Sequence, residues 1–258
     1  MEQEQIIRKV TEIGNGAHIF APKEWMNEKV LIIRIEKKSI KEEIMEILYP
    51  HLNKIIAVFI YGSHARAEAS ETSDIDVLII SKEKFKIEKK RNFEFLVIPE
   101  HSIESAIKTN PILMYSIFKE AKAIINEDYL DKYKNKKIAL KDFSSFIEST
   151  KKISVKSSED LLELDRKTGK TVSTSVLYSA ILRLRGVFII NCLLKNKLYS
   201  NSSFRTWIKK NIEIDYEKVY EVYRYVRDNK NIKNEIPIET GEKLINFLKK
   251  EIDKLSKE

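Results

Sequence analysis

The stretch YGSHARAEASETSDIDVLII, residues 61–80, carries the most informative pattern in this chain. It begins where the apolar run KIIAVFIYGS, residues 54–63, ends in a Gly-Ser pair, and it closes on a second apolar run that opens with two aspartates. A third run, NFEFLVIP, follows at residues 92–99, after the lysine-rich segment KEKFKIEKKR. Short apolar runs bounded by turn residues predict buried strands. The middle of the chain is therefore expected to hold a small β-sheet.

Three carboxylates fall on one face of the predicted strands. Side chains alternate along a strand, so Asp74 and Asp76 project from one face and Ile75 from the other. Two charges roughly 6.5 Å apart repel by roughly 2.5 kcal/mol at an effective dielectric of about 20. If residues 92–99 pair alongside, Glu94 joins them. Oxygen ligands without clustered His or Cys favour Mg²⁺ or Mn²⁺ over Zn²⁺, although a solvated sheet edge is the alternative interpretation.

The Gly-Ser pair at the end of the first strand predicts a phosphate site. Gly62 allows backbone amides to approach a phosphate, and the hydroxyl of Ser63 adds a donor. The short helix expected in HARAEAS would direct its N-terminus at the same anion, and Arg66 supplies positive charge nearby. A phosphate cradle beside metal carboxylates predicts the transfer of a phosphate-linked group. Gly62, Ser63 and Arg66 are the predicted nucleotide-binding residues.

The combined pattern resembles a known family. GSHARAEASETSDIDVLII followed by FEFLVIPE resembles the nucleotidyltransferase signature of the DNA polymerase beta superfamily, and in particular its minimal prokaryotic members. The resemblance covers about residues 55–126 and implies a Mg²⁺-dependent enzyme with an NTP substrate, ATP being the expected donor. The residues that it implies for the site are Gly62 and Ser63 for the phosphates and Asp74, Asp76 and Glu94 for the metal ions, with Glu94 also helping to activate the acceptor hydroxyl.

Two residues depart from the family pattern. Ala67 stands where a glycine is common, and the third carboxylate is Glu94 where aspartate is more frequent. The longer glutamate side chain is chemically competent, but it leaves the acceptor geometry less defined.

The predicted fold class is α+β: a small mixed sheet with flanking helices, a short N-terminal β-hairpin module and an all-α C-terminal domain. A helix capped by Ser39 and Glu42 is expected in the stretch SIKEEIMEILYPHL, ending at Pro50, and Pro111 should break the helical pattern of residues 102–125. From about residue 142 onward the chain shows amphipathic helical runs. The hydrophilic segment NEDYLDKYKNKK, residues 126–137, is the expected linker. The predicted domains are residues 1–37, 38–130 and 140–258.

The composition is that of a basic chain with a single cysteine, which rules out an internal disulfide. The 258 residues are 43% hydrophobic and 33% charged, with a formal net charge of +8. Such dense mixed charge is mostly solvated surface, although it permits an anionic partner. Cys192 has apolar neighbours and is expected to be a core thiol. We expect a cytoplasmic protein without a membrane partner, because no apolar run approaches the roughly 20 residues of a membrane span and the start lacks signal-peptide character.

The N-terminal stretch IGNGAHIFAPKEW, around the turn Gly14-Asn15-Gly16, resembles swapped-hairpin DNA-binding modules of the AbrB/MazE type and small archaeal proteins. Such modules interleave strands between two copies, so the resemblance implies a homodimer and a DNA partner for the module. About 35 residues of strand and turn are also too few to bury a core alone.

Three functions stay open at this stage. The first is a nucleotidyltransferase that acts on a hydroxyl of an RNA, a protein or a small molecule, the acceptor being undetermined. The second is a DNA-binding regulator or a toxin–antitoxin component. The third is an antibiotic-type nucleotidyltransferase resembling the aminoglycoside enzymes. The C-terminal helices faintly resemble HEPN-like partners, but all four histidines precede that region, which argues against a HEPN ribonuclease.

Overall fold

The structure is a computed structural model that describes residues 4, 6–33, 38–90, 92–169, 171–232 and 235–256. The chain forms two compact units, Met1–Ile47 and Leu48–Glu258. The second unit continues from the sheet into the C-terminal helices, so the three predicted domains stay predictions.

The first unit contains the expected hairpin. Strands β1 (Thr11–Ile13) and β2 (Gly16–His18) pair antiparallel around a turn in which Gly14 has a φ of 51°. A 3-10 turn, η1 (Lys23–Trp25), follows. The apolar run KVLIIRIE, residues 29–36, also predicts a strand. That strand is not seen, because residues 29–33 form neither helix nor strand, and residues 34–36 lie outside the described part.

Helix α1 (Ile40–Leu48) begins at the predicted cap. The backbone N–H of Ser39 donates to Glu42 Oε2 at 2.8 Å, and the N–H of Glu42 donates back to Ser39 Oγ at 3.3 Å. This reciprocal pair is a capping box, as the Ser39-x-x-Glu42 spacing predicts. The 3-10 segment η2 (Tyr49–Lys54), with Pro50 near its start, leads from this helix into the sheet.

The described residues form one larger sheet with the strand order β5-β4-β3-β6. Its strands are β3 (Ile55–Tyr61), β4 (Ile75–Ser81), β5 (Phe93–Pro99) and β6 (Lys122–Ile125). Strand β3 pairs antiparallel with β4 and β6, whereas β4 and β5 run parallel. The three predicted strands and the mixed α+β class are confirmed.

One face of this sheet packs on two helices, α3 (Ile103–Thr109) and α4 (Pro111–Glu120), which are divided at Pro111 as predicted. Phe59, Leu78 and Ile98 belong to the same buried cluster as helix residues such as Phe118. Alternation along β4 puts Asp76 on the face of Leu78, one step nearer the strand start. The predicted site therefore lies at the end of the sheet face that α4 covers.

Residues 126–137 are not the linker that their hydrophilic composition suggested. Residues Glu127–Lys134 form helix α5, capped by Asn126. Leu130 and Tyr133 are buried, and the ring of Tyr133 stacks on Phe118 at 4.7 Å between centroids. Two apolar residues three positions apart give this polar helix one buried face, which composition alone does not reveal.

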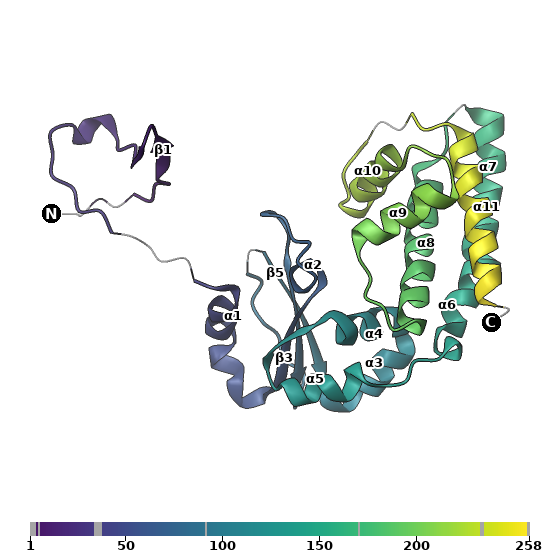
Figure 1. Cartoon of the computed structure of the whole chain (residues 1–258), viewed down its shortest axis with the longest axis horizontal. Coiled ribbons are helices and arrows are strands. Elements are labelled where there is room, and N and C mark those ends of the chain that lie inside the picture. The colour runs from purple at the N-terminus through teal and green to yellow at the C-terminus, as the bar shows by residue number, and fades with distance from the viewer. Residues whose placement is uncertain are drawn as a thin grey trace. The chain divides into compact units, whose positions relative to one another are not determined.

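The C-terminal region is all helical, as expected (Figure 1). After the 3-10 turn η4 (Leu140–Phe143), α6 (Ser144–Ser149) continues through the π-helical segment η5 (Thr150–Val155) into α7. Helix α9 (Asn201–Asn211), which was not predicted from the sequence, follows the Ser200 cap. The remaining helices are α7 (Lys156–Thr168), α8 (Thr174–Leu194), α9 (Asn201–Asn211), α10 (Tyr216–Arg227) and α11 (Ile238–Leu255).

Helix α8 is the central helix of this region. It is long and apolar enough to meet the length and composition of a membrane span, so the expectation that no run reaches that length is wrong. Contacts with α4, α7, α10 and α11 surround it, and residues such as Leu177, Ile181 and Leu184 are fully buried. A helix that is apolar on most sides is typical of a protein core. Cys192 is also buried and free, and burial raises the pKa of its thiol.

Candidate active site

The strand register places the predicted carboxylates together. Asp76 on β4 lies opposite Glu94 on the parallel strand β5, and opposite Tyr61 on β3. Neighbouring strands are roughly 4.8 Å apart, so Asp76 and Glu94 are direct cross-strand neighbours. Asp74 directly precedes Ile75, the first residue of β4, two residues before Asp76. Asp74 and Glu94 are exposed, whereas Asp76 is half-buried between its neighbours.

The electrostatics of this cluster centre on Asp76. Burial, followed by the charges of Glu94 and Asp74, raises the pKa of the Asp76 carboxyl to about 6. The pKa of Tyr61 is also raised, first by burial and then by the charges of Asp76 and Glu94. Both shifts have the sign expected from excess negative charge. The cluster therefore favours a cation.

Gly62 makes a close approach that other residues would block. Its φ is 70°, and a Cβ built at this position would lie 2.1 Å from Oδ2 of Asp76. The Gly62–Ser63 turn thus lies directly against the carboxylate of Asp76. A glycine is required here both by the left-handed backbone and by the missing side chain.

The helix after the turn is shorter than predicted. Helix α2 spans only Gly62–Ala65 instead of the HARAEAS segment, so it is a single turn without the dipole of a longer helix. The chain leaves this turn through Ala67, whose φ is 58°. Left-handed backbone favours glycine, and this gives a structural reason for the glycine that the family commonly has at this place.

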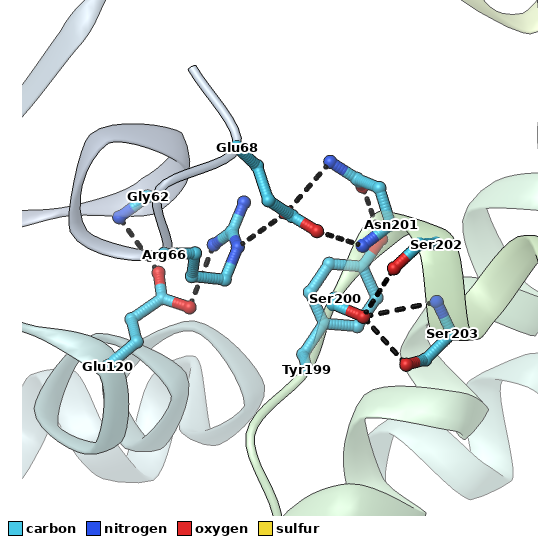
Figure 2. A network of polar contacts seen from close by, with 9 residues as sticks. All are labelled: Gly62, Arg66, Glu68, Glu120, Tyr199, Ser200, Asn201, Ser202 and Ser203. Carbon is cyan, nitrogen blue, oxygen red and sulfur yellow. Dashed lines mark hydrogen bonds and ion pairs between the residues drawn. The ribbon is translucent and has the colours of Figure 1, made fainter.

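Glu120, at the end of α4, holds two of the predicted phosphate-binding groups (Figure 2). The N–H of Gly62 donates to Glu120 Oε1 at 2.8 Å, and Nη1 of Arg66 donates to Glu120 Oε2 at 2.7 Å. Arg66 Nε also donates to Glu68 Oε2 at 3.0 Å. The Gly62 amide and Arg66 were predicted to face phosphate, and in this structure both are paired with carboxylates instead.

Ser63 keeps its donor group available. No hydrogen-bond partner of its hydroxyl occurs among the described residues, and its carbonyl accepts from the N–H of Glu68 at 2.9 Å. His64 Nε2 lies 3.4 Å from the carbonyl oxygen of Ser73, within hydrogen-bond distance. Of the three predicted phosphate-binding residues, Gly62 and Arg66 are hydrogen-bonded to Glu120. The Ser63 hydroxyl has no hydrogen-bond partner among the described residues, so it is the group that is free to bind a phosphate.

The donor chemistry fits a hard divalent cation. Asp74, Asp76 and Glu94 offer only carboxylate oxygens, the ligands that Mg²⁺ and Mn²⁺ prefer. Burial, followed by the charges of Glu94 and Asp74, raises the pKa of Asp76, so a bound cation would stabilise the charged form of this carboxyl. Within the described residues, no three His, Cys, Asp or Glu side chains form a ready ligand group. The carboxylates are thus neighbours whose side chains must converge to hold a metal ion.

Comparison with known sequences identifies the class of protein. The family "Polymerase beta, Nucleotidyltransferase" matches residues 42–130. Over 98 residues the chain is 30% identical to a "putative protein adenylyltransferase" of Methanocaldococcus jannaschii, a match that spans 38% of this chain and 88% of the relative. The chain therefore belongs to the polymerase beta type nucleotidyltransferases and is a nucleotidyltransferase.

Solved structures show more distant similarity. A spectinomycin adenyltransferase, AAD(9) from Enterococcus faecialis, solved with ATP and spectinomycin, matches with a TM-score of 0.45 and 15% identity, covering 82% of this chain and 97% of that one. A nucleotidyltransferase-like protein from Exiguobacterium sibiricum matches with a TM-score of 0.38 and 12% identity, covering 84% and 75%.

Glu68 and Glu120 were not among the site residues predicted from the sequence. Glu120 lies 58 positions from the glycine whose amide it binds, and Glu68 stands in a polar stretch that reads as surface. The only signal was burial of a charge: the side chains of Arg66, Glu68 and Glu120 are 10%, 19% and 7% exposed. Burial of this kind is not visible in a single sequence.

Proposed function

We propose that this nucleotidyltransferase moves a nucleoside monophosphate from an NTP, with ATP as the expected donor, to an acceptor hydroxyl and releases pyrophosphate. The reaction depends on Mg²⁺ or Mn²⁺. The observation that carries this proposal is the Asp74, Asp76 and Glu94 cluster beside the Gly62 turn, where burial and then the neighbouring carboxylates raise the pKa of Asp76. Such a cluster binds a cation favourably, because without one its carboxylates repel each other.

In the proposed reaction, the acceptor oxygen forms a bond to the α-phosphorus, and the bond from that phosphorus to the bridging β-phosphate oxygen breaks. The electron pair leaves with pyrophosphate. Glu94, exposed at the edge of the cluster, takes the proton of the acceptor hydroxyl. Ser63 donates to the phosphates of the donor. Asp74, Asp76 and Glu94 would hold the metal, which supplies stabilisation of charge on the transferring phosphate.

A protein hydroxyl is the first acceptor to test. Support comes from the relative from Methanocaldococcus jannaschii, whose name describes transfer of adenylate to protein. RNA and small molecules remain the other acceptor classes, and the test below separates all three.

The test uses labelled nucleotides. The purified full-length protein is incubated with Mg²⁺, cell extract and ATP labelled at either the α- or the γ-phosphate, and with each other NTP in parallel. We expect α-label to enter acid-precipitated protein and γ-label to appear only in pyrophosphate. Asp76→Asn should abolish incorporation, whereas Asp128→Asn, a surface aspartate on α5, should not.

Transfer of γ-label instead would indicate a kinase and contradict the proposal. So would α-label incorporation that persists in Asp76→Asn. Label entering RNA or a small molecule would retain nucleotidyl transfer and change the acceptor.

A further inference from the structure

We propose that Glu68, Arg66 and Glu120 form a relay through which the start of helix α9 positions the Gly62–Ser63 turn for the nucleotide. The inference rests on the proposed function, because it concerns how the same site binds ATP. It assigns the three residues a positioning role and makes Asn201, far away in sequence, part of the nucleotide site's support.

The near end of the relay is Glu120. One of its oxygens accepts the N–H of Gly62, the residue whose Cα faces Asp76 without a side chain between them. Its other oxygen accepts from Arg66. A single carboxylate therefore orients both the turn and the guanidinium, and any shift of Arg66 is transmitted to the turn.

The middle of the relay is Arg66. Its Nε and Nη1 are bound by two carboxylates, and its side chain is only 10% exposed. Charged hydrogen bonds in such a poorly solvated place are directional and resist reorientation. The Arg66 guanidinium also lies over the ring of Tyr199, 5.4 Å from its centroid. This contact ties Arg66 to the loop before α9 a second time.

The far end is the first turn of α9. Glu68 Oε1 accepts the N–H of Asn201 at 2.9 Å, and Glu68 Oε2 accepts from Asn201 Nδ2 at 3.2 Å. Tyr199 OH donates to Oδ1 of the same asparagine at 2.7 Å. Figure 2 shows the chain of contacts from Gly62 to this turn. Residues 133 positions apart in sequence are thereby joined in one polar network.

The alternative is that these bonds only hold the helical region onto the sheet. The two roles give different measurements. Loss of a purely structural contact changes the melting temperature but does not change the affinity of the folded protein for ATP. A relay changes that affinity even where the melting temperature is kept.

Asn201 offers a precise variant. It is the first residue of α9, and Ser200 before it is extended, with φ −141° and ψ 150°. Proline is favoured at the first helical position and tolerates an extended residue before it. Asn201→Pro therefore removes both bonds to Glu68 while the helix is retained. Asn201→Ala keeps the backbone bond, and Thr174→Pro places a proline at the same position of α8, away from the relay.

The dissociation constant of ATP with Mg²⁺ is measured by calorimetry, and the melting temperature by differential scanning, for each full-length variant. We expect Asn201→Pro to weaken ATP binding about tenfold, the size of one charged hydrogen bond. Asn201→Ala should stay within about twofold, and Thr174→Pro should match the parent. Adding Asn201→Pro to Glu68→Ala should cause no further loss, because Glu68→Ala already removes both oxygens that accept from Asn201.

Unchanged ATP affinity in Asn201→Pro, with or without a lower melting temperature, would overturn the relay while the proposed function stands. Fully additive losses in the double variant would overturn it too. A parent protein that binds no ATP would instead overturn the proposed function, and with it the inference.

Discussion

Gly62 is the residue on which the geometry of the site depends most directly. Gly62→Ala adds a methyl group that would overlap Oδ2 of Asp76. We expect loss of detectable ATP binding with Mg²⁺ and a stability loss of about 1–2 kcal/mol or more, because the left-handed backbone is strained and the aspartate is displaced. Calorimetric titration and thermal melting measure the two effects.

Gly14→Ala is the matched control. Gly14 also has a positive φ, 51°, but an added methyl group meets nothing within 4 Å. It should show the backbone strain alone and bind ATP as the parent does. ATP binding by Gly62→Ala at parental strength would show that the turn does not need to approach Asp76.

Asp76 gives the metal-free protein a pH dependence. Its pKa in the folded state, about 6, exceeds the ordinary 3.8. The folded state therefore binds this proton more tightly, and the resulting stability is present at low pH and is lost as the pH rises from about 4 to about 6. In EDTA at pH 7, Asp76→Asn should be as stable as the parent or more so, by about 1 kcal/mol after allowance for solvent screening.

Melting in EDTA at pH 4.5 and pH 7.5 tests this, because the advantage of Asp76→Asn over the parent should be larger at the higher pH. Mg²⁺ with ATP should then raise the melting temperature of the parent and not of the variant. A strongly destabilised variant that retains the ligand shift would mean that the aspartate is structural.

At the scale of elements, Gly186 lets two helices approach. An alanine Cβ at this position of α8 would lie 2.4 Å from Cζ of Phe146 on α6. Alanine favours helix over glycine by about 1 kcal/mol, but overpacking costs about 1–3 kcal/mol. We expect Gly186→Ala to lower the melting temperature, because the clash outweighs the propensity.

Gly169→Ala is its control, since its added methyl group meets nothing nearer than 3.9 Å. The free energy of unfolding of this variant should lie within about 0.5 kcal/mol of that of the parent. A Gly186→Ala protein that melts at or above the parent would show that α6 can move away from α8 at little cost.

The elements also show where local patterns were sufficient. Strands β3, β4 and β5 are continuous apolar runs, and Ser39 with Glu42 forms the cap that its spacing predicts. Helix α5 was mistaken for a linker because its buried face consists of only two residues. Helix α9 has a Ser200 cap and apolar Phe204 and Ile208 four positions apart, a signal that was present but overlooked.

At the scale of the whole molecule, we predict a dimer formed through the N-terminal unit. Among its described residues, Leu31 and Ile33 are 85% and 73% exposed, and Ile13 and Phe20 are also exposed. Apolar surface of this kind is typical of an interaction site, and the hairpin is too small to bury a core alone. Light scattering of the full-length protein should give twice the mass of one chain.

Substituting Leu31 and Ile33 together by aspartate should give a monomer. The same change at Ile153 and Leu164, exposed residues of the helical region, should leave the dimer intact. A monomeric parent would contradict the prediction.

DNA binding by the N-terminal module stays a prediction as well. A binding titration with DNA at two salt concentrations tests it, because phosphate contacts weaken as the salt concentration rises.

The amino-acid sequence was sufficient to predict the α+β class, the strands on which Asp76 and Glu94 lie, and the resemblance to the nucleotidyltransferase family. These follow from local order, because short apolar runs mark the strands and a Gly-Ser pair marks the turn. Asp74 directly precedes β4, two residues before Asp76. The residues that hold the Gly-Ser turn could be found only from the packing of the folded chain. Glu120 and Glu68 act through bonds to residues 58 and 133 positions away, and their role depends on burial, which is set by the packing of the whole chain.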